Sequence, residues 1–229
     1  MTLSFLLEPT PCAKCERLVK YRSAIKPKKS LFLHYHNNPV LPFGDESAWL
    51  LICGLAPGAH GANRTGRVFT GDGAGELLYR ALFEAGLSTG PESVSADDGL
   101  DLKGVIITNA LLCVPPGNKA LPSEFNNCRP NLEALLAAKP LVTDILCIGR
   151  DAFIQVCKVL GERAHEFKNN GEYRVGRYKV WAIYHCSRLN QNTGRIKMED
   201  MVLLLKRIKK AKNPGNDLLN SGVKGGSIS

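Results

Sequence analysis

Residues Trp49 to Gly66 read WLLICGLAPGAHGANRTG, a short apolar run followed by a loop that contains four glycines. The same arrangement returns near the end of the chain, where the mainly apolar run Lys179–Tyr184 leads into HCSRLNQNTGR, His185 to Arg195. Each run has the length and composition of a buried strand. Because α/β proteins keep their sites in the loops that follow buried strands, we expect the two loops to build one cleft.

Outward from these loops, apolar runs alternate with stretches of helical periodicity. The expected strands are Leu50–Leu55, Gly104–Asn109, Asp144–Gly149 and Tyr178–Tyr184, with Tyr173–Val175 joined to the last by a turn at Gly176-Arg177. The expected helices are Gly73–Ala85, Arg129–Lys139 with Asn126 and Asn127 as caps, Asp151–Leu160 and Met198–Ala211. This alternation predicts a parallel sheet covered by helices on both faces. We expect one domain over residues 1–212 and a disordered tail over residues 213–229.

The composition is that of an ordinary globular protein, with 44% hydrophobic and 22% charged residues among 229. No apolar run has the length of a membrane span and the N-terminus lacks a secretory signal pattern, so we expect a cytoplasmic protein without a membrane partner. The net charge of +9 is concentrated in two basic blocks, Lys14–Lys29 and Lys206–Lys212. Such blocks favour a polyanionic partner, although solvated helix faces would give the same pattern.

Seven of the eight cysteines fall into two groups, and Cys186 is a separate case. Three are expected to be inert core thiols because they lie in predicted strands or helices: Cys53, Cys147 and Cys157. The others lie outside the predicted core elements: Cys12, Cys15, Cys113 and Cys128. Four thiolates can hold zinc or an iron–sulfur cluster, and they can also remain free. The wide spacing of the second pair suits a [4Fe–4S] cluster better than zinc, whose sites usually combine two closely spaced pairs.

Familiar phosphate-binding and nucleophile motifs do not account for the two loops. The Walker pattern needs Gly-Lys-Ser/Thr where this chain has Thr65-Gly66-Arg67, and no G-x-S-x-G elbow occurs. Three polar residues remain as candidates. Asp72 opens a predicted helix, either as a plain N-cap or as a functional carboxylate. Asn109 ends a predicted strand and His185 follows one, positions that suit ligand contact but also ordinary turns.

Several motifs together resemble the uracil-DNA glycosylase superfamily, specifically its iron–sulfur family 5, or type b. They are GLAPGAHGANRTGR followed by FTGD, a strand that ends in Thr108-Asn109-Ala110, the loop His185–Arg195 and the four cysteines outside the core. The resemblance implies a three-layer α/β/α sandwich with a central four-stranded parallel sheet. It also implies that a [4Fe–4S] cluster is held by Cys12, Cys15, Cys113 and Cys128, where it pins loops near a DNA-binding face.

The resemblance also implies roles for the polar candidates. Asp72 would be the catalytic carboxylate, and His185 would assist the departure of the base. Asn109 would contact the edge of the base, and Phe69 would stack on its face. The remaining substrate-binding residues that it implies are Gly54, Ala56, Gly58, Ser187 and Asn192.

The loop His185–Arg195 carries two further expectations. Arg188 or Leu189 would enter the duplex at the position that the extruded base leaves. Cys186 stands where family members usually have proline. Because proline would stiffen the backbone, its replacement leaves the position of His185 less fixed.

The implied function is DNA repair. The enzyme would extrude uracil, and other deaminated bases such as hypoxanthine, from double- or single-stranded DNA and hydrolyse the N-glycosidic bond to leave an abasic site. We expect a monomer associated with the nucleoid of a prokaryote. Two alternatives stay open: an iron–sulfur family 4, or type a, enzyme restricted to uracil, and an iron–sulfur DNA-binding protein without catalysis.

Overall fold

The computed structural model describes residues 12–27 and 34–212, so the expected tail, residues 213–229, lies outside the described part of the chain. Six strands form one sheet in the order β1-β3-β2-β4-β6-β5. The four central strands are parallel: β3 (Val105–Asn109), β2 (Leu50–Gly54), β4 (Asp144–Ile148) and β6 (Tyr178–Ile183). The edge strands are antiparallel to their neighbours: β1 (Phe43–Gly44) and β5 (Gly171–Val175). The predicted parallel sheet is confirmed, with two antiparallel edges added.

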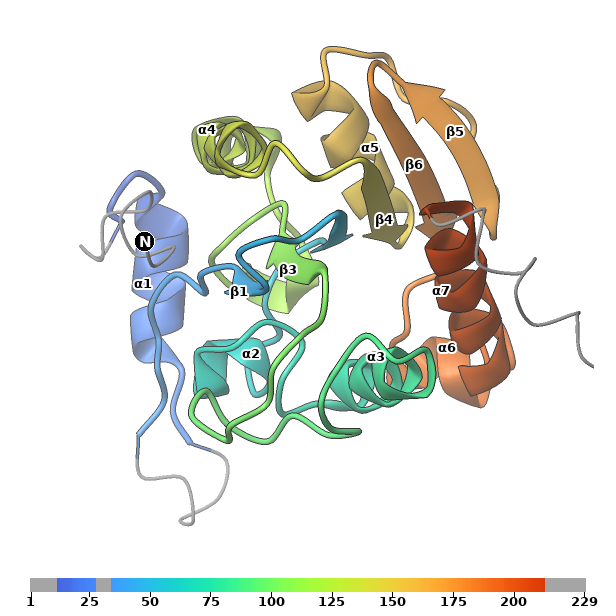
Figure 1. The fold of residues 1–229 in the computed structure, drawn as a ribbon. Helices are drawn as coiled ribbons and strands as arrows, with labels where there is room; N and C mark the ends of the chain where they lie inside the picture. The colour runs from blue at the N-terminus through green and yellow to red at the C-terminus, as the bar shows by residue number, and fades with distance from the viewer. Residues whose placement is uncertain (1–11, 28–33, 213–229) are drawn as a thin grey trace, which may run out of the picture.

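Helices cover both faces of this sheet, which gives the three layers (Figure 1). Alternate residues of β2 point to opposite faces: Leu50 and Ile52 pack with α3 and α7, whereas Leu51 and Cys53 pack with α4 and α5. The helices are α1 (Glu16–Ala24), α2 (Ala62–Thr65), α3 (Gly73–Glu84), α4 (Pro122–Ala138), α5 (Arg150–Val159), α6 (Arg188–Asn192) and α7 (Met198–Lys212), with a short 3-10 helix, η2, at Pro116–Asn118. None of the helices in the described part of the chain has the length and apolarity needed to cross a membrane.

The central strands are apolar on both sides because both sides are covered. Every residue of β2, β3 and β4 is buried. Such continuous burial is what a parallel sheet between two helical layers requires. The strands β5 and β6 form the predicted hairpin, in which Val175 pairs with Tyr178 across the turn at Gly176-Arg177.

Helix α4 begins seven residues earlier than predicted, at Pro122 rather than Arg129. Proline is favourable at a first helical position, where no backbone N–H is needed. The Glu124 carboxylate accepts a hydrogen bond from the Leu121 backbone N–H at 2.7 Å and so closes the helix start. Asn126 and Asn127, predicted as caps, therefore lie inside the helix.

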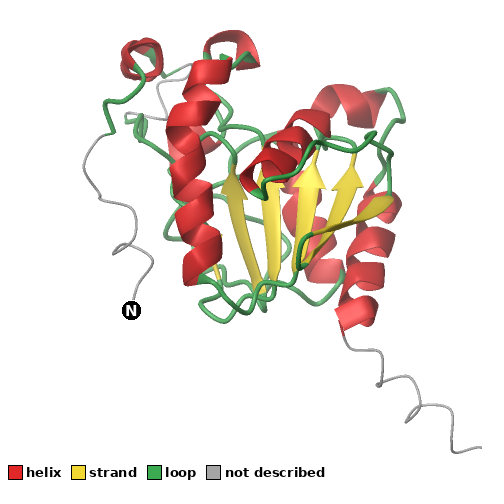
Figure 2. Cartoon of the chain, turned by 90° about the horizontal axis from the view of Figure 1, so that it is seen from above, coloured by secondary structure: helices red, strands yellow, loops and turns green. Residues whose placement is uncertain are grey.

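Helix α7 carries the basic block Lys206–Lys212 away from the carboxyl ends of the strands. Its last turns reach Thr143, which precedes β4, through a hydrogen bond from Lys212 Nζ at 3.3 Å. In Figure 2 this helix ends at the edge of the sheet opposite the arrowheads of the central strands. Lys209 donates to the Ala85 carbonyl at the C-terminal end of α3, and Arg207 pairs with Glu172 at 2.6 Å. Three residues of the block thus contact the protein itself, and its last turn lies at the amino edge of the sheet.

Candidate active site

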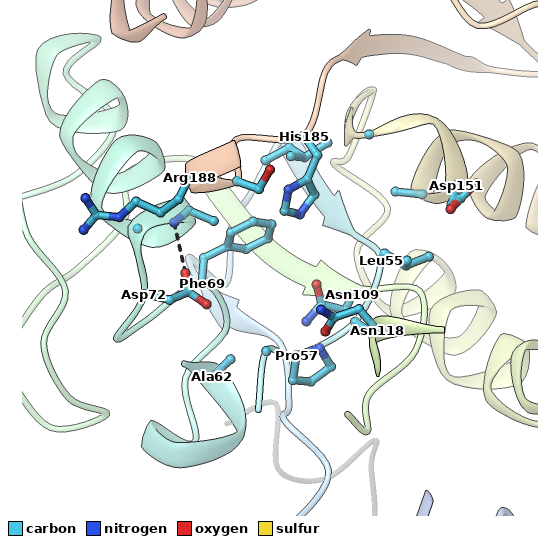
Figure 3. Close-up of a pocket in the computed structure, with 18 of the residues that line it drawn as sticks. Leu55, Pro57, Ala62, Phe69, Asp72, Asn109, Asn118, Asp151, His185 and Arg188 are labelled. Atoms are coloured by element: carbon cyan, nitrogen blue, oxygen red, sulfur yellow. Dashed lines mark hydrogen bonds between the residues drawn. The ribbon is translucent and has the colours of Figure 1, made fainter. Parts of the chain in front are cut away.

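A cavity of about 500 Å³ opens at the carboxyl ends of the four parallel strands (Figure 3). Each strand leads into part of its wall. The loop after β2 contributes Leu55–Gly58, and the end of β3 contributes Asn109. The segment after β4 contributes Gly149–Ala152, which include the start of α5, and the segment that leads into α6 contributes His185, Ser187 and Arg188 after β6. Asp72 and Phe69 come from the segment that leads into α3. The expectation that the two glycine-containing loops build one cleft is confirmed.

The two carboxylate oxygens of Asp72 have different surroundings. Oδ1 accepts hydrogen bonds from the backbone N–H groups of Ala74 and Gly75, each at 3.1 Å, and so caps α3. Oδ2 faces the glycine loop, where a Cβ on Gly58 would lie 3.0 Å from it and one on Gly61 would be closer still. The N-cap interpretation is confirmed for Oδ1, and it leaves Oδ2 beside the cavity.

The Phe69 ring and the Asn109 carboxamide both pack against Gly54. A Cβ on Gly54 would lie 2.7 Å from Phe69 Cζ and would also overlap Asn109 Oδ1. Phe69 itself has φ of +51°, a conformation that side chains other than glycine rarely adopt. Within the described residues, the Asn109 carboxamide makes no hydrogen bond to the protein although Asn109 is only 3% exposed. This buried amide thus keeps its donors and acceptor for a molecule in the cavity.

The His185 ring turns into the cavity toward Phe69, with the two ring centres 6.4 Å apart (Figure 3). Burial lowers the pKa of His185, and the nearby negative charge of Asp72 acts in the opposite direction. Since the ordinary pKa of histidine is already about 6.5, the ring is neutral at pH 7. A neutral imidazole donates one hydrogen bond without carrying a full charge into the site.

The other residues that the sequence suggested are only partly brought together. Ala56, Gly58 and Ser187 line the cavity, and Gly54 lies behind Asn109 and Phe69. Asn192 is exposed at the end of α6 and is absent from the cavity wall.

Three polar lining residues were missed: Asn118, Arg150 and Asp151. Asn118 lies in η2 with φ of +58°, next to Asn109 in Figure 3, and Asp151 lies in the first turn of α5. Asp151 follows β4 almost directly, so the rule that sites gather after strands would have found it. Asn118 does not directly follow a strand, so the same rule would not have found it.

The segment after His185, expected as a loop, contains the short helix α6. Ser187 caps it by accepting a hydrogen bond from the Asn190 backbone N–H at 3.4 Å. Arg188 pairs with Glu76 at 2.7 Å, whereas Leu189 is 71% exposed. Cys186 is fully buried, and burial raises the pKa of its thiol to about 12. Packing therefore holds the backbone at Cys186 without the stiffness of proline.

The four cysteines that are expected to hold a cluster lie in the N-terminal segment, in the loop after β3 and in α4. Leu18, Leu111 and Cys113 form a small buried cluster against which Cys15 and Cys128 pack. Backbone and side-chain N–H groups point at the sulfurs: Leu112 N–H donates to Cys128 at 3.3 Å, and the Asn127 amide donates to Cys15 at 3.5 Å. Across residues 12–27 and 34–212, no three His, Cys, Asp or Glu side chains converge closely enough to hold a single metal ion.

A buried arginine accompanies these thiols. Arg22 is 3% exposed, and its guanidinium donates to Cys113 Sγ at 3.0 Å and to the Cys12 carbonyl at 3.0 Å. In the described part of the chain it contacts no carboxylate. A buried positive charge is costly unless a negative group balances it. Burial raises the pKa of the Cys113 thiol to about 11, while the Arg22 charge lowers it. The donor set therefore fits a group that holds these sulfurs as thiolates.

Comparison with known proteins gives a consistent result. Residues 41–209 match the model of the Uracil DNA glycosylase superfamily. The chain is 43% identical over 198 residues to the Type-5 uracil-DNA glycosylase of Pyrobaculum aerophilum, covering 86% of this chain and 87% of that protein. It is 42% identical over 212 residues to the Type-5 uracil-DNA glycosylase of Thermus thermophilus, covering 90% and 96%. Similarity to the Type-4 uracil-DNA glycosylase of Archaeoglobus fulgidus is lower, 33% over 161 residues, covering 65% and 70%.

Proposed function

Since this chain belongs to the uracil DNA glycosylase superfamily, and within it to the type-5 enzymes, we propose that it removes uracil from DNA by hydrolysing the N-glycosidic bond. The observation that carries the proposal is the convergence of Asp72, Asn109 and His185 with the Phe69 ring in one cavity at the carboxyl edge of the sheet. A base inside a stacked duplex cannot reach such a cavity, so the nucleotide is extruded into it.

Recognition of the extruded base falls to Phe69 and Asn109. The base stacks on the Phe69 ring, which Gly54 allows to lie close to Asn109. The Asn109 carboxamide, which makes no hydrogen bond within the described residues, offers both a donor and an acceptor to the edge of the base, which is what a uracil edge requires. Leu189, exposed on α6, enters the duplex in place of the base. Arg188 is less suited to this task because it is paired with Glu76.

Bond cleavage builds positive charge on the sugar and negative charge on the departing base. The Oδ2 atom of Asp72 stabilises the sugar cation and orients the attacking water, as carboxylates do in glycoside hydrolysis. The neutral His185 ring donates a hydrogen bond to the oxygen of the base on which negative charge develops. Backbone N–H groups of the loop Leu55–Gly58 add to this stabilisation.

A [4Fe–4S] cluster would be held by the thiolates of Cys12, Cys15, Cys113 and Cys128. Four cysteine thiolates are the ligand set that such a cluster would take. The buried guanidinium at Cys113 and the N–H groups that point at Cys15 and Cys128 support this assignment. The cluster supplies a covalent anchor that ties the N-terminal segment to α4 and to the loop that carries Asn118.

The DNA backbone lies across the carboxyl edge of the sheet, around the mouth of the cavity. Arg150 is exposed there at the start of α5, and Lys119 is exposed next to Asn118. Both suit phosphate contacts that hold DNA without reading its sequence. The basic block Lys206–Lys212 is too remote for this task because α7 carries it to the opposite edge.

The substrate range extends to deaminated purines such as hypoxanthine, in double- or single-stranded DNA. The cavity of about 500 Å³ supports this part of the proposal, because it reaches past Phe69 to Asn118 and Asp151 and exceeds what one pyrimidine needs. The protein acts as a monomer on the chromosome, in the cytoplasm of a prokaryote.

Strand cleavage tests the proposed activity directly. A labelled duplex with one uracil is incubated with the protein and then treated with alkali, which cuts the strand at an abasic site. We expect cleavage at uracil and none in the matched thymine duplex. Binding without cleavage would support the DNA-binding alternative instead. Cleavage at uracil but not at hypoxanthine would restrict the range as in the type-4 alternative.

A further inference from the structure

One side-chain amide joins the two segments that carry Asp72 and His185. The Nε2 atom of Gln191 donates to the Gly73 carbonyl at 2.8 Å and to the Cys186 carbonyl at 2.7 Å. Gly73 directly follows Asp72, and Cys186 directly follows His185. A glutamine amide has two N–H groups, so a single nitrogen satisfies both carbonyls at once.

Neighbouring groups of the same region strengthen this junction. The Asn190 amide donates to the His185 carbonyl at 2.7 Å, and the Cys186 thiol donates to the Ala74 carbonyl at 3.4 Å. A Cβ on Gly73 would overlap the Arg188 side chain, so α6 lies directly against the start of α3. The helix α6 is thus held against both segments. Within it, the Gln191 side chain forms a hydrogen bond with each of them.

We propose that Gln191 is a positioning residue that fixes Asp72 and His185 relative to each other. The inference rests on the proposed function, because it gives these two residues the reacting charges to stabilise. Gln191 is absent from the wall of the catalytic cavity and acts through the backbone alone. Catalysis depends steeply on such placement, since a shift of about 1 Å can lower a rate by about 10²-fold.

The test replaces Gln191 with Met, which has a similar length but no N–H groups, and with Glu, whose carboxylate would face the two carbonyls. Gln155→Met on α5 is the matched control, because Gln155 is also half-buried and makes no hydrogen bond within the described residues. We expect both Gln191 variants to lower the single-turnover rate of uracil excision by about 10-fold or more, with DNA binding nearly unchanged. Gln155→Met should change neither.

A second readout does not depend on activity. The charge of Asp72 raises the pKa of His185, so separating the two residues should lower the pKa that NMR titration of the imidazole reports. We expect this decrease in Gln191→Met and not in Gln155→Met. If wild-type protein excises no uracil, the proposed function fails, whereas the titration still decides whether Gln191 fixes the two residues.

A double-mutant cycle completes the design. If Gln191 acts by placing Asp72, its replacement should cost less in an Asp72→Asn background, where the charge is already gone. Full additivity of the two effects would overturn the inference. A wild-type rate together with an unchanged His185 titration in Gln191→Met would also overturn it.

Discussion

Asp72 and Gly61 lie so close together that a Cβ on residue 61 would overlap the Oδ2 and Cγ atoms of the Asp72 carboxylate. The glycine loop therefore makes the space in which Oδ2 lies, while Oδ1 is fixed by two backbone N–H groups of α3. The loop and the helix together determine where the negative charge is. The glycine loop thus positions the negative charge of Asp72 that the proposed chemistry needs.

Gly61→Ala should displace the Asp72 carboxylate and lower the single-turnover excision rate by about 10²-fold. Overpacking at a buried glycine also costs about 1–3 kcal/mol of stability, so thermal unfolding should be measured alongside. Gly90→Ala is the control, because its Cβ would meet only the flexible end of Leu100, at 3.2 Å. Unchanged activity in Gly61→Ala would mean that the position of Asp72 does not matter.

His185 should titrate below its ordinary pKa of about 6.5, because burial disfavours the charged ring. The excision rate should therefore stay constant as the pH falls to about 6.5. It should decline only when the pH passes through the lowered pKa, where the ring takes up a second proton. The unfolded chain takes up this proton near pH 6.5, so stability should decrease as the pH falls from about 6.5 to the lowered pKa of the folded protein. NMR titration of the imidazole checks this directly, and a value above 6.5 would contradict the neutral donor.

DNA affinity should depend on the carboxyl edge of the sheet. Arg150→Gln should weaken binding to undamaged and uracil-containing duplexes by similar factors and reduce the salt slope by about 0.9, the value for one lost phosphate contact. Lys206→Gln, on the part of α7 that extends away from the cavity, should change neither quantity. The opposite pattern would mean that DNA lies along the basic block of α7. Fluorescence anisotropy at several salt concentrations measures both quantities.

Iron content should distinguish the two groups of cysteines. Cys113→Ala removes one of the four proposed ligands and should lose iron, visible absorbance and solubility, because the N-terminal segment and α4 lose their common anchor. Cys147→Ala, in the buried strand β4, should keep its iron. Iron retained in Cys113→Ala and lost in Cys147→Ala would exclude the proposed ligand set.

The sequence predicted the sheet well because its strands are buried on both faces, which leaves an unambiguous apolar run such as Leu50–Gly54. It predicted the start of α4 poorly, since Asn126 and Asn127 are residues that favour helix caps but lie inside the helix. The polar candidates Asp72, Asn109 and His185 all reach one cavity, because the carboxyl ends of parallel strands meet at one edge.

Charge was harder to interpret than the polar motifs. The composition of the block Lys206–Lys212 favours a polyanion site, but the edge of the sheet that it reaches depends on the direction of α7, which tertiary packing sets. Asn118 could not be found either, because it reaches the cavity only through the path of the loop after β3. Both results depend on contacts between distant parts of the chain, which local sequence does not encode.

The most direct test of the account is the single-turnover rate of Asp72→Asn on a uracil-containing duplex, measured with DNA bound at saturation. Asparagine keeps the shape of the side chain and caps a helix as well as aspartate, so α3 and the fold should be preserved. If Oδ2 carries the charge that stabilises the sugar cation, the rate should fall by a large factor while DNA binding stays nearly unchanged. A rate equal to that of the wild-type protein would contradict the account and leave Asp72 as an N-cap alone.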